Sequence, residues 1–252
     1  MGHEKLIGGK YYHIYNRGIN GCNLFIDPIE YEQFLELYNK FILPIADTYA
    51  WVLMPNHFHI VVSIKENLVY KYSGINPEKP DNTVPFKDKS WYETHKWETI
   101  ELPLSEFKKL PENPNIKRPV PYRHFGHLFN AYTSYFNPRR ERTGSLFERP
   151  YKRKSITNSN QLKKVIQYVH NNPVHHGFCE HPLEYPWSSY LTCISEKPTN
   201  LKRDAVINLF GNKKENLSLN QQTKSYRVAM EKWLGLKTID HVLEAENEII
   251  RS

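Results

Sequence analysis

His57-Phe58-His59 is the segment whose residue types and spacing point most directly to chemistry. Side chains two positions apart in a β-strand share one face, so both imidazoles would point the same way while Phe58 enters the opposite layer. Two imidazoles held side by side are suited to bind one divalent metal ion. The alternative is an ordinary pair of half-exposed histidines on a sheet. The apolar strand that follows and the turn that precedes the pair favour the metal-binding interpretation. They do not exclude an ordinary pair of surface histidines.

A metal that acts on phosphate needs further oxygen or nitrogen ligands, together with open positions for the substrate. Tyr168 and Asn172 lie four residues apart in a segment with helical apolar spacing at Leu162, Ile166 and Val169. They therefore share a helix face beside the apolar stripe, one turn apart. A tyrosine and an amide one helical turn apart are common in proteins, and the pair indicates a site only if its helix packs next to the histidine strand.

A basic stretch runs from Pro138 to Lys154 and carries seven Lys or Arg residues against two Glu residues. Positive charge that follows a phosphate backbone, mixed with aromatic rings that stack on unpaired bases, is typical of single-strand binding. A solvated basic loop is the alternative. The DNA-binding candidates are Arg139, Arg140, Arg142, Arg149, Tyr151, Lys152, Arg153 and Lys154.

The elements that would position these residues can be read from local patterns. Residues 10–17 alternate as a strand, and Asp27, Pro28 and Glu30 predict a capped helix that runs to about Phe41. Two apolar runs, Thr48–Met54 and Phe58–Ser63, predict strands joined by a tight turn at Pro55-Asn56.

Two further helices are predicted, one around residues 125–132 that stops at Asn137-Pro138, and one from Leu162 to about Asn172. Between them and the strands, residues 64–120 hold 7 of the 17 prolines and show no sustained period, which predicts an insertion with little regular structure. Near the C-terminus, Asp204–Phe210 and Tyr226–Leu234 predict a small helical appendage.

Four motifs, in their order along the chain, resemble those of the REP-associated tyrosine transposases. These are relatives of the single-tyrosine insertion-sequence transposases among the HUH nucleases. The four motifs are Met54–His59 with Ile60-Val61-Val62 after it, Gly144–Lys152, Tyr168–Val174 and Tyr185–Tyr190. Apart from the insertion, the resemblance covers residues 11–190. It does not account for the insertion or for the tail.

The resemblance implies an α+β fold, with a ferredoxin-like or palm-like antiparallel sheet and helices on one face. It thereby implies a transposase-like domain over residues 8–190, interrupted by the insertion at 64–120. Residues 191–252 would form a C-terminal helical accessory region.

The resemblance also implies residue roles. His57 and His59 would be metal ligands, Tyr168 the nucleophile and Asn172 the third ligand, with Mg²⁺ or Mn²⁺ as the cofactor. Lys164, one turn before Tyr168, would lower the pKa of the phenol or bind phosphate, although a solvated lysine is the plainer interpretation.

The implied activity is metal-dependent cleavage and rejoining of single-stranded, hairpin-bearing repeat DNA through a 5′-phosphotyrosine. One phosphodiester replaces another, so no nucleotide cofactor is expected, and the sequence has no Walker phosphate loop. A domesticated DNA-binding protein without cleavage and a Rep- or relaxase-type nickase are the alternatives. All four proposed catalytic and metal-binding residues are present, which favours the enzyme.

Composition agrees with a nucleic-acid partner, because the 252 residues carry a formal net charge of +7. No apolar stretch approaches the length of a membrane span, and the three cysteines form no C-x-x-C pair. We therefore expect a cytoplasmic, nucleoid-associated protein without a membrane partner, acting as a monomer or a homodimer.

Overall fold

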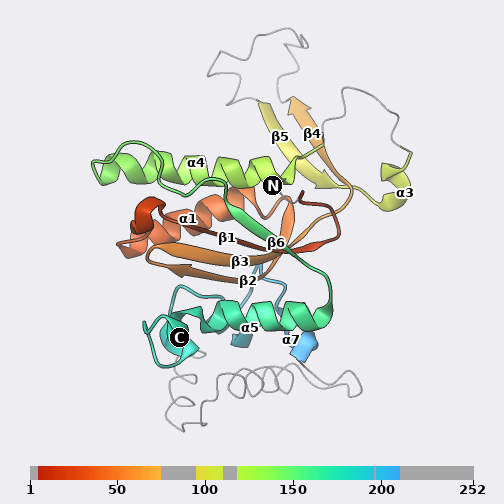
Figure 1. The fold of residues 1–252 in the computed structure, drawn as a ribbon. Helices are drawn as coiled ribbons and strands as arrows, with labels where there is room; N and C mark the ends of the chain where they lie inside the picture. The colour runs from red at the N-terminus through yellow and green to blue at the C-terminus, as the bar shows by residue number, and fades with distance from the viewer. Residues whose placement is uncertain (1–4, 75–94, 110–117, 196, 211–252) are drawn as a thin grey trace.

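The protein is described by a computed structural model that covers residues 5–74, 95–109, 118–195 and 197–210. Its centre is a four-stranded antiparallel sheet with the strand order β2-β3-β1-β6 (Figure 1). The strands are β1 (Tyr11–Arg17), β2 (Ala46–Met54), β3 (His57–Ile64) and β6 (Lys152–Ile156).

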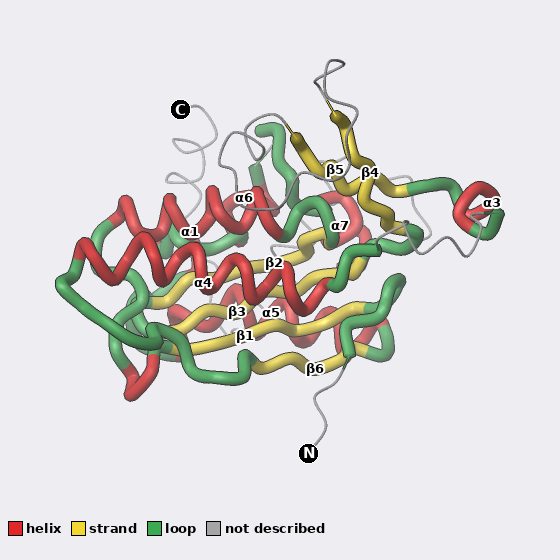
Figure 2. The backbone as a smooth tube through the Cα atoms, turned by 90° about the horizontal axis from the view of Figure 1, so that it is seen from above, coloured by secondary structure: helices red, strands yellow, loops and turns green. Residues whose placement is uncertain are grey.

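Two helices connect the strands across the same face of the sheet. Helix α1 (Pro28–Phe41) joins β1 to β2, and α4 (Pro121–Arg139) lies between β3 and β6 in the chain. Figure 2 shows α1 and α4 side by side over the strands. The resulting β-α-β-β-α-β order, with β1 and β3 at the centre, is the ferredoxin-like connectivity.

The expectation of helices on one face holds for α1 and α4 but not for α5 (Ser159–His175). Helix α5 covers the opposite face of the sheet (Figure 1). The physical reason lies in β2 and β3, whose apolar runs are buried in both directions. Phe58 packs toward α1 and α4, whereas Val52 and Val61 pack toward α5, so two hydrophobic cores form.

The helix predicted from Asp27 is confirmed. Asp27 is the N-cap of α1, Pro28 is the first helical residue, and the Glu30 side chain accepts a hydrogen bond from the Asp27 backbone N–H at 3.2 Å. This capping box closes the first turn. The predicted strand pair is confirmed as well, with β2 and β3 joined at Pro55-Asn56.

The prediction of little regular structure in residues 64–120 is wrong for the described part of that segment. Strands β4 (Leu68–Gly74) and β5 (His95–Glu101) form an antiparallel pair, followed by the short helix α3 (Leu104–Phe107). Tyr70 Oη lies 2.5 Å from His124 Nε2 of α4, and this contact connects the strand pair to the core. The sequence signal for this strand was the run Leu68-Val69-Tyr70, whose aliphatic and aromatic residues favour strands.

After α5 the chain returns along the outer edge of β2. It includes the 3₁₀ turn at Pro182–Glu184, α6 (Tyr190–Ile194) and α7 (Arg203–Phe210). Trp187 O accepts a hydrogen bond from Leu53 N at 2.9 Å, and Thr48 O accepts one from Lys202 N at 2.8 Å. Helices α6 and α7 contribute to the same core as α5, and the domain boundary at residues 190/191 stays a prediction. The predicted helix at Tyr226–Leu234 lies outside the described residues.

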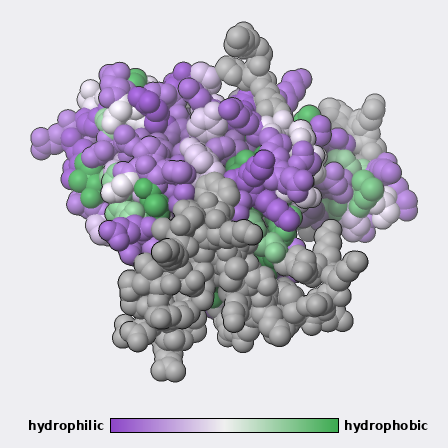
Figure 3. Space-filling model, turned by 60° about the horizontal axis from the view of Figure 1, so that its bottom comes forward, coloured by the Kyte–Doolittle hydropathy of each residue, from purple (hydrophilic) through white to green (hydrophobic). Residues whose placement is uncertain are grey.

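Among the described helices, none combines the length and the apolar character needed to cross a membrane. Figure 3 looks onto the molecule from the side of α5. Hydrophilic side chains cover most of the described surface there, and hydrophobic ones gather in small separate patches.

Candidate metal and nucleophile site

His57 and His59 lie on β3 and share one face of the sheet, as the alternation predicts, and in the structure this face is the one toward α5. Phe58 between them is fully buried in the core under α1 and α4. Pro55 O accepts hydrogen bonds from Leu24 N and Phe25 N at 2.6 and 3.0 Å, so the turn before the histidines is held by backbone contacts. The ring centroids of His57 and His59 are 5.2 Å apart.

Helix α5 brings Tyr168 and Asn172 to this strand. Asn158 is its N-cap and accepts a hydrogen bond from Gln161 N at 2.9 Å. The helix packs its apolar stripe on β2 and β3 and continues through Pro173 to His175, three residues beyond the predicted end. Burial of Pro173 at the last turn offsets the intrinsic preference against a helix before proline.

His57 and Asn172 meet directly. His57 Nε2 lies 3.0 Å from Asn172 Oδ1, and His57 Nδ1 lies 2.7 Å from Asn56 Oδ1. When Nδ1 donates to Asn56, Nε2 presents a lone pair, and Asn172 Oδ1 is an acceptor too. A cation would satisfy both atoms, because ligands at right angles on an ion with bonds of about 2.1 Å lie about 3 Å apart.

His59 is held by a residue that the sequence did not single out. Its Nδ1 lies 2.9 Å from Nε2 of His13, which projects from β1 on the same face of the sheet. Burial is the main reason that the pKa of His59 falls to about 2 and that of His13 to about 4. Burial also lowers the pKa of His57, against the raising effect of its bond to Asn172. These imidazoles are therefore neutral at neutral pH, the state in which imidazole binds metals.

Tyr168 lies over the histidines with 38% of its surface exposed. The centroid of its ring is 5.3 Å from that of His59 and 6.0 Å from that of His13, in edge-on arrangements. Asn172, one turn later, is fully buried, and its Nδ2 has no hydrogen-bond partner among the described residues. Lys164, one turn before Tyr168, is exposed.

The histidines open into a cleft of about 730 Å³. His176 lines it from the end of α5, with its ring centroid 5.0 Å from that of His57. Lys152 lines it from the edge strand β6. Besides His57 and His59, the other lining residues are Tyr15, Asn16, Arg17, Asn23, Pro55, Asn56, Glu148 and Phe178.

The predicted DNA-binding residues separate in the structure. Lys152 and Lys154 pair with Tyr15 and His13 of β1, and cross-strand partners share a face, so both lysines lie on the side of the cleft. Arg153 pairs with Ile14 and lies on the opposite face, over the Tyr151 ring. Arg139 is exposed over the Tyr135 ring, Arg142 contacts Asn137 and the Ser145 carbonyl, and Arg149 is exposed.

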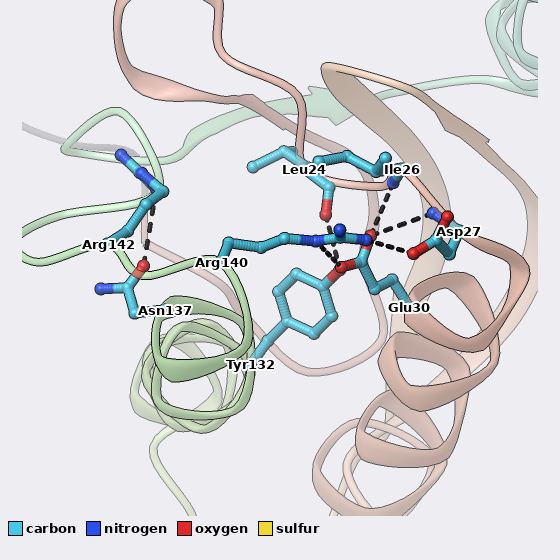
Figure 4. A network of polar contacts seen from close by, with 8 residues as sticks. All are labelled: Leu24, Ile26, Asp27, Glu30, Tyr132, Asn137, Arg140 and Arg142. Atoms are coloured by element: carbon cyan, nitrogen blue, oxygen red, sulfur yellow. Dashed lines mark hydrogen bonds and ion pairs between the residues drawn. The ribbon is translucent and has the colours of Figure 1, made fainter.

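Arg140 has a partner within the protein. Its guanidinium forms ion pairs with Asp27 and with the fully buried Glu30, the latter at 2.7 Å (Figure 4). These two hydrogen bonds raise the pKa of Arg140. The sequence pattern placed Arg140 in a DNA-binding stretch. In the structure its positive charge is balanced by the carboxylates of Asp27 and Glu30, and this geometry does not support a contact with DNA phosphate.

The donor set fits a divalent ion that takes further ligands from its substrate. In the described part of the chain, no three His, Cys, Asp or Glu side chains gather as a metal cluster. The candidate ligands are two neutral imidazoles and one amide oxygen, which is an incomplete shell for Mg²⁺ or Mn²⁺. Such a shell leaves positions open for phosphate oxygens and water.

Sequence reasoning placed His176 close to the site but assigned no role to His13 or Asn56. Of these two, only His13 had a local signal. It lies two residues from both Tyr11 and Tyr15 and so shares their face of the first strand. Its contact with His59 depends on how β1 and β3 pair, which alternation alone does not determine.

No protein-family model and no curated protein matches this chain. Among solved structures, the chain is similar to a REP-associated tyrosine transposase bound to a REP hairpin. The two share 12% sequence identity at a TM-score of 0.49, over 77% of this chain and 84% of that one.

Proposed function

We propose that this protein is a metal-dependent, single-strand DNA endonuclease and strand transferase of the HUH type, related to the REP-associated tyrosine transposases. One observation carries the proposal. His57 Nε2 of β3 lies 3.0 Å from Asn172 Oδ1 of α5, and the Tyr168 ring lies 5.3 Å from that of His59, while both histidines line an open cleft. The four sequence motifs that contain these residues support the same assignment.

His57, His59 and Asn172 would hold Mg²⁺ or Mn²⁺. The bound ion would act as a Lewis acid that withdraws electron density from the scissile phosphate. The protein would contribute by keeping the imidazoles neutral through burial, by orienting them through Asn56 and His13, and by burying the amide of Asn172 next to His57.

Tyr168 is the proposed nucleophile. Its phenol loses a proton, and the phenolate oxygen forms a bond to phosphorus while the bond from phosphorus to the 3′ oxygen breaks. The 3′ oxygen takes up a proton and leaves as a free 3′-OH, and the 5′ phosphate stays on the tyrosine. Attack by a 3′-OH reverses the step and rejoins DNA without a nucleotide. Lys164, on the same helix face, would stabilise the phenolate or the phosphate.

The substrate in this proposal is single-stranded DNA next to a hairpin. Lys152 and Lys154 supply positive charge on the cleft side, and Tyr15 and His13 lie between them and His59. Helix α5 packs on β2 and β3, while Lys152 and Lys154 are exposed and Tyr15 is half-buried, so this half of the sheet is accessible to a strand. Arg139, Arg142, Arg149, Arg153 and Tyr151 would act outside the cleft.

The test is a search for the covalent intermediate. The protein is incubated with Mn²⁺ and a pool of single-stranded hairpins that have randomised unpaired flanks, and the DNA-linked peptide is mapped. We expect the adduct at Tyr168, and we expect Tyr168→Phe to reduce its formation by more than about 1,000-fold while hairpin binding persists. Tyr135→Phe, which removes a hydroxyl on α4, is the matched control.

A linkage at Tyr135 or Tyr151 would refute the assignment of Tyr168. Hairpin binding without any adduct, in the presence of Mg²⁺ or Mn²⁺, would instead support the DNA-binding protein without cleavage. Chelation of the metal should abolish the adduct and leave binding.

A further inference from the structure

A second hollow, larger than the catalytic cleft, lies on the other side of the sheet. It has a volume of about 960 Å³ and runs between α4 and the segment 146–151, and we call it the α4 groove. Leu146, Phe147, Pro150, Phe129 and Tyr122 contribute apolar walls.

The walls present aromatic rings in a fixed arrangement. The ring of Phe129 has its centroid 5.0 Å from that of Phe147 and 5.3 Å from that of Tyr151. Tyr122, at the start of α4, is 50% exposed. An apolar lining with aromatic rings, one of them exposed, suits an aromatic guest, and a nucleobase is such a guest.

The rim of the groove is positively charged. Arg123, Arg149 and Arg153 line it, and the Arg153 guanidinium lies 5.0 Å from the centre of the Tyr151 ring. Among the described lining residues one is acidic, Glu148, and its carboxylate is already paired with Arg17 at 2.8 Å. The occupant that this charge favours is an anion that carries an aromatic group.

The groove and the catalytic cleft adjoin. Asn16 and Glu148 line both, and Asn16 Nδ2 donates a hydrogen bond to the Glu148 carbonyl at 3.1 Å. A polymer with phosphates and bases at regular spacing could therefore contact both at once.

We infer that the α4 groove binds an unpaired nucleobase of the same nucleic acid strand that reaches the cleft, with the flanking phosphates on Arg123, Arg149 and Arg153. The inference rests on the proposed single-strand binding but not on cleavage at Tyr168. A base seated here gives the protein a second contact with unpaired DNA, at a place that duplex DNA would not fill.

Gly126 permits a direct test. It lies on α4 within the groove lining, and a Cβ at this position would meet no atom within 4 Å. Gly126→Leu therefore places an apolar side chain at the groove lining without a clash at its Cβ, and it replaces a residue that disfavours helices. Ser134→Leu places the same side chain on an exposed position of the same helix outside the groove lining, and serves as the matched control.

The measurement is binding of a fluorescent single strand of about 12 thymidines and of the same length of abasic backbone, with metal chelated so that no cleavage contributes. We expect Gly126→Leu to weaken binding of the thymidine strand by about 10-fold, with the salt dependence unchanged because no charge is altered. Ser134→Leu should bind like the unmodified protein. The preference of the unmodified protein for bases over abasic backbone should disappear in Gly126→Leu.

Equal affinity of the three proteins for the thymidine strand would overturn the inference. So would an equal loss of affinity by Gly126→Leu for both strands, because that pattern means that the groove does not recognise a base. Thermal unfolding of each variant checks that α4 stays folded. Since the readout is binding, the inference can fail while the Tyr168 adduct forms, and it can hold where no adduct is found.

Discussion

Each candidate histidine ligand has its second ring nitrogen occupied. Asn56 Oδ1 faces Nδ1 of His57, and His13 Nε2 faces Nδ1 of His59. Hydrogen bonds at the second nitrogen fix the tautomer and the ring orientation of metal-binding histidines. In the proposed metal site, His13 would therefore position the ring of His59. Tyr15 stacks on both rings, with centroid distances of 4.8 Å to His13 and 5.6 Å to His59.

We expect His13→Ala to lower the affinity for Mn²⁺ by about 10- to 100-fold, because the His59 ring loses the contact that orients it. His13→Gln retains an acceptor near the position of Nε2 and should recover part of the affinity. Calorimetric titration with Mn²⁺ in the absence of DNA measures both. His127→Ala, which removes an exposed histidine on α4, is the control. Unchanged Mn²⁺ affinity in His13→Ala would contradict the positioning role.

Helices α1 and α4 are joined at their ends by a charged network. Glu30 Oε2 accepts hydrogen bonds from Ile26 N and Asp27 N at 2.6 and 3.2 Å, and its other oxygen pairs with Arg140 (Figure 4). Tyr132 of α4 donates to the Leu24 carbonyl at 2.6 Å in the same network. A buried carboxylate is tolerated only while these partners are present.

Arg140→Gln should lower the midpoint of thermal unfolding, because it leaves the carboxylate of Glu30 buried without its counter-charge. Arg139→Gln, one residue earlier, removes an exposed arginine and should leave the midpoint unchanged. Calorimetry on the two variants tests the difference. If both variants unfold like the unmodified protein and Arg140→Gln alone loses DNA binding, Arg140 acts on DNA after all.

At the scale of the whole molecule, the sheet separates two surfaces. On one side, Lys152 and Lys154 accompany the histidines, and on the other, Arg153 lies with the α4 groove. The single basic run of the sequence thus places positive charge on both faces of the sheet, because successive residues of β6 point to opposite faces. Of the three basic residues of β6, Lys152 and Lys154 share the sheet face of the histidines and Arg153 does not.

Replacing Lys152 and Lys154 with Gln should weaken binding of hairpin and scrambled single strands alike. The loss of two charges near phosphates should reduce the slope of log affinity against log salt by about one to two. Base discrimination should survive, since phosphate contacts position a strand while base contacts specify its sequence. The same change at the exposed Lys108 and Lys109, which follow α3, is the control (Figure 1). An equal loss in both double variants would mean that the effect is general charge.

Several features were determined by local sequence. The capping box at Asp27 and Glu30, the strand pair around Pro55-Asn56, and the shared face of His57 and His59 depend on residues within a few positions of one another. Such short-range patterns can be read without the fold. The shared helix face of Tyr168 and Asn172 was readable for the same reason.

Tertiary structure alone decided which of these patterns meet. The proximity of Asn172 to His57, the contact of His13 with His59, and the pairing of Arg140 with Glu30 join residues that are far apart in the chain. They depend on strand order, on register and on which face each helix covers. These choices are made by burial of apolar surface over the whole chain, and no local window of sequence contains that information.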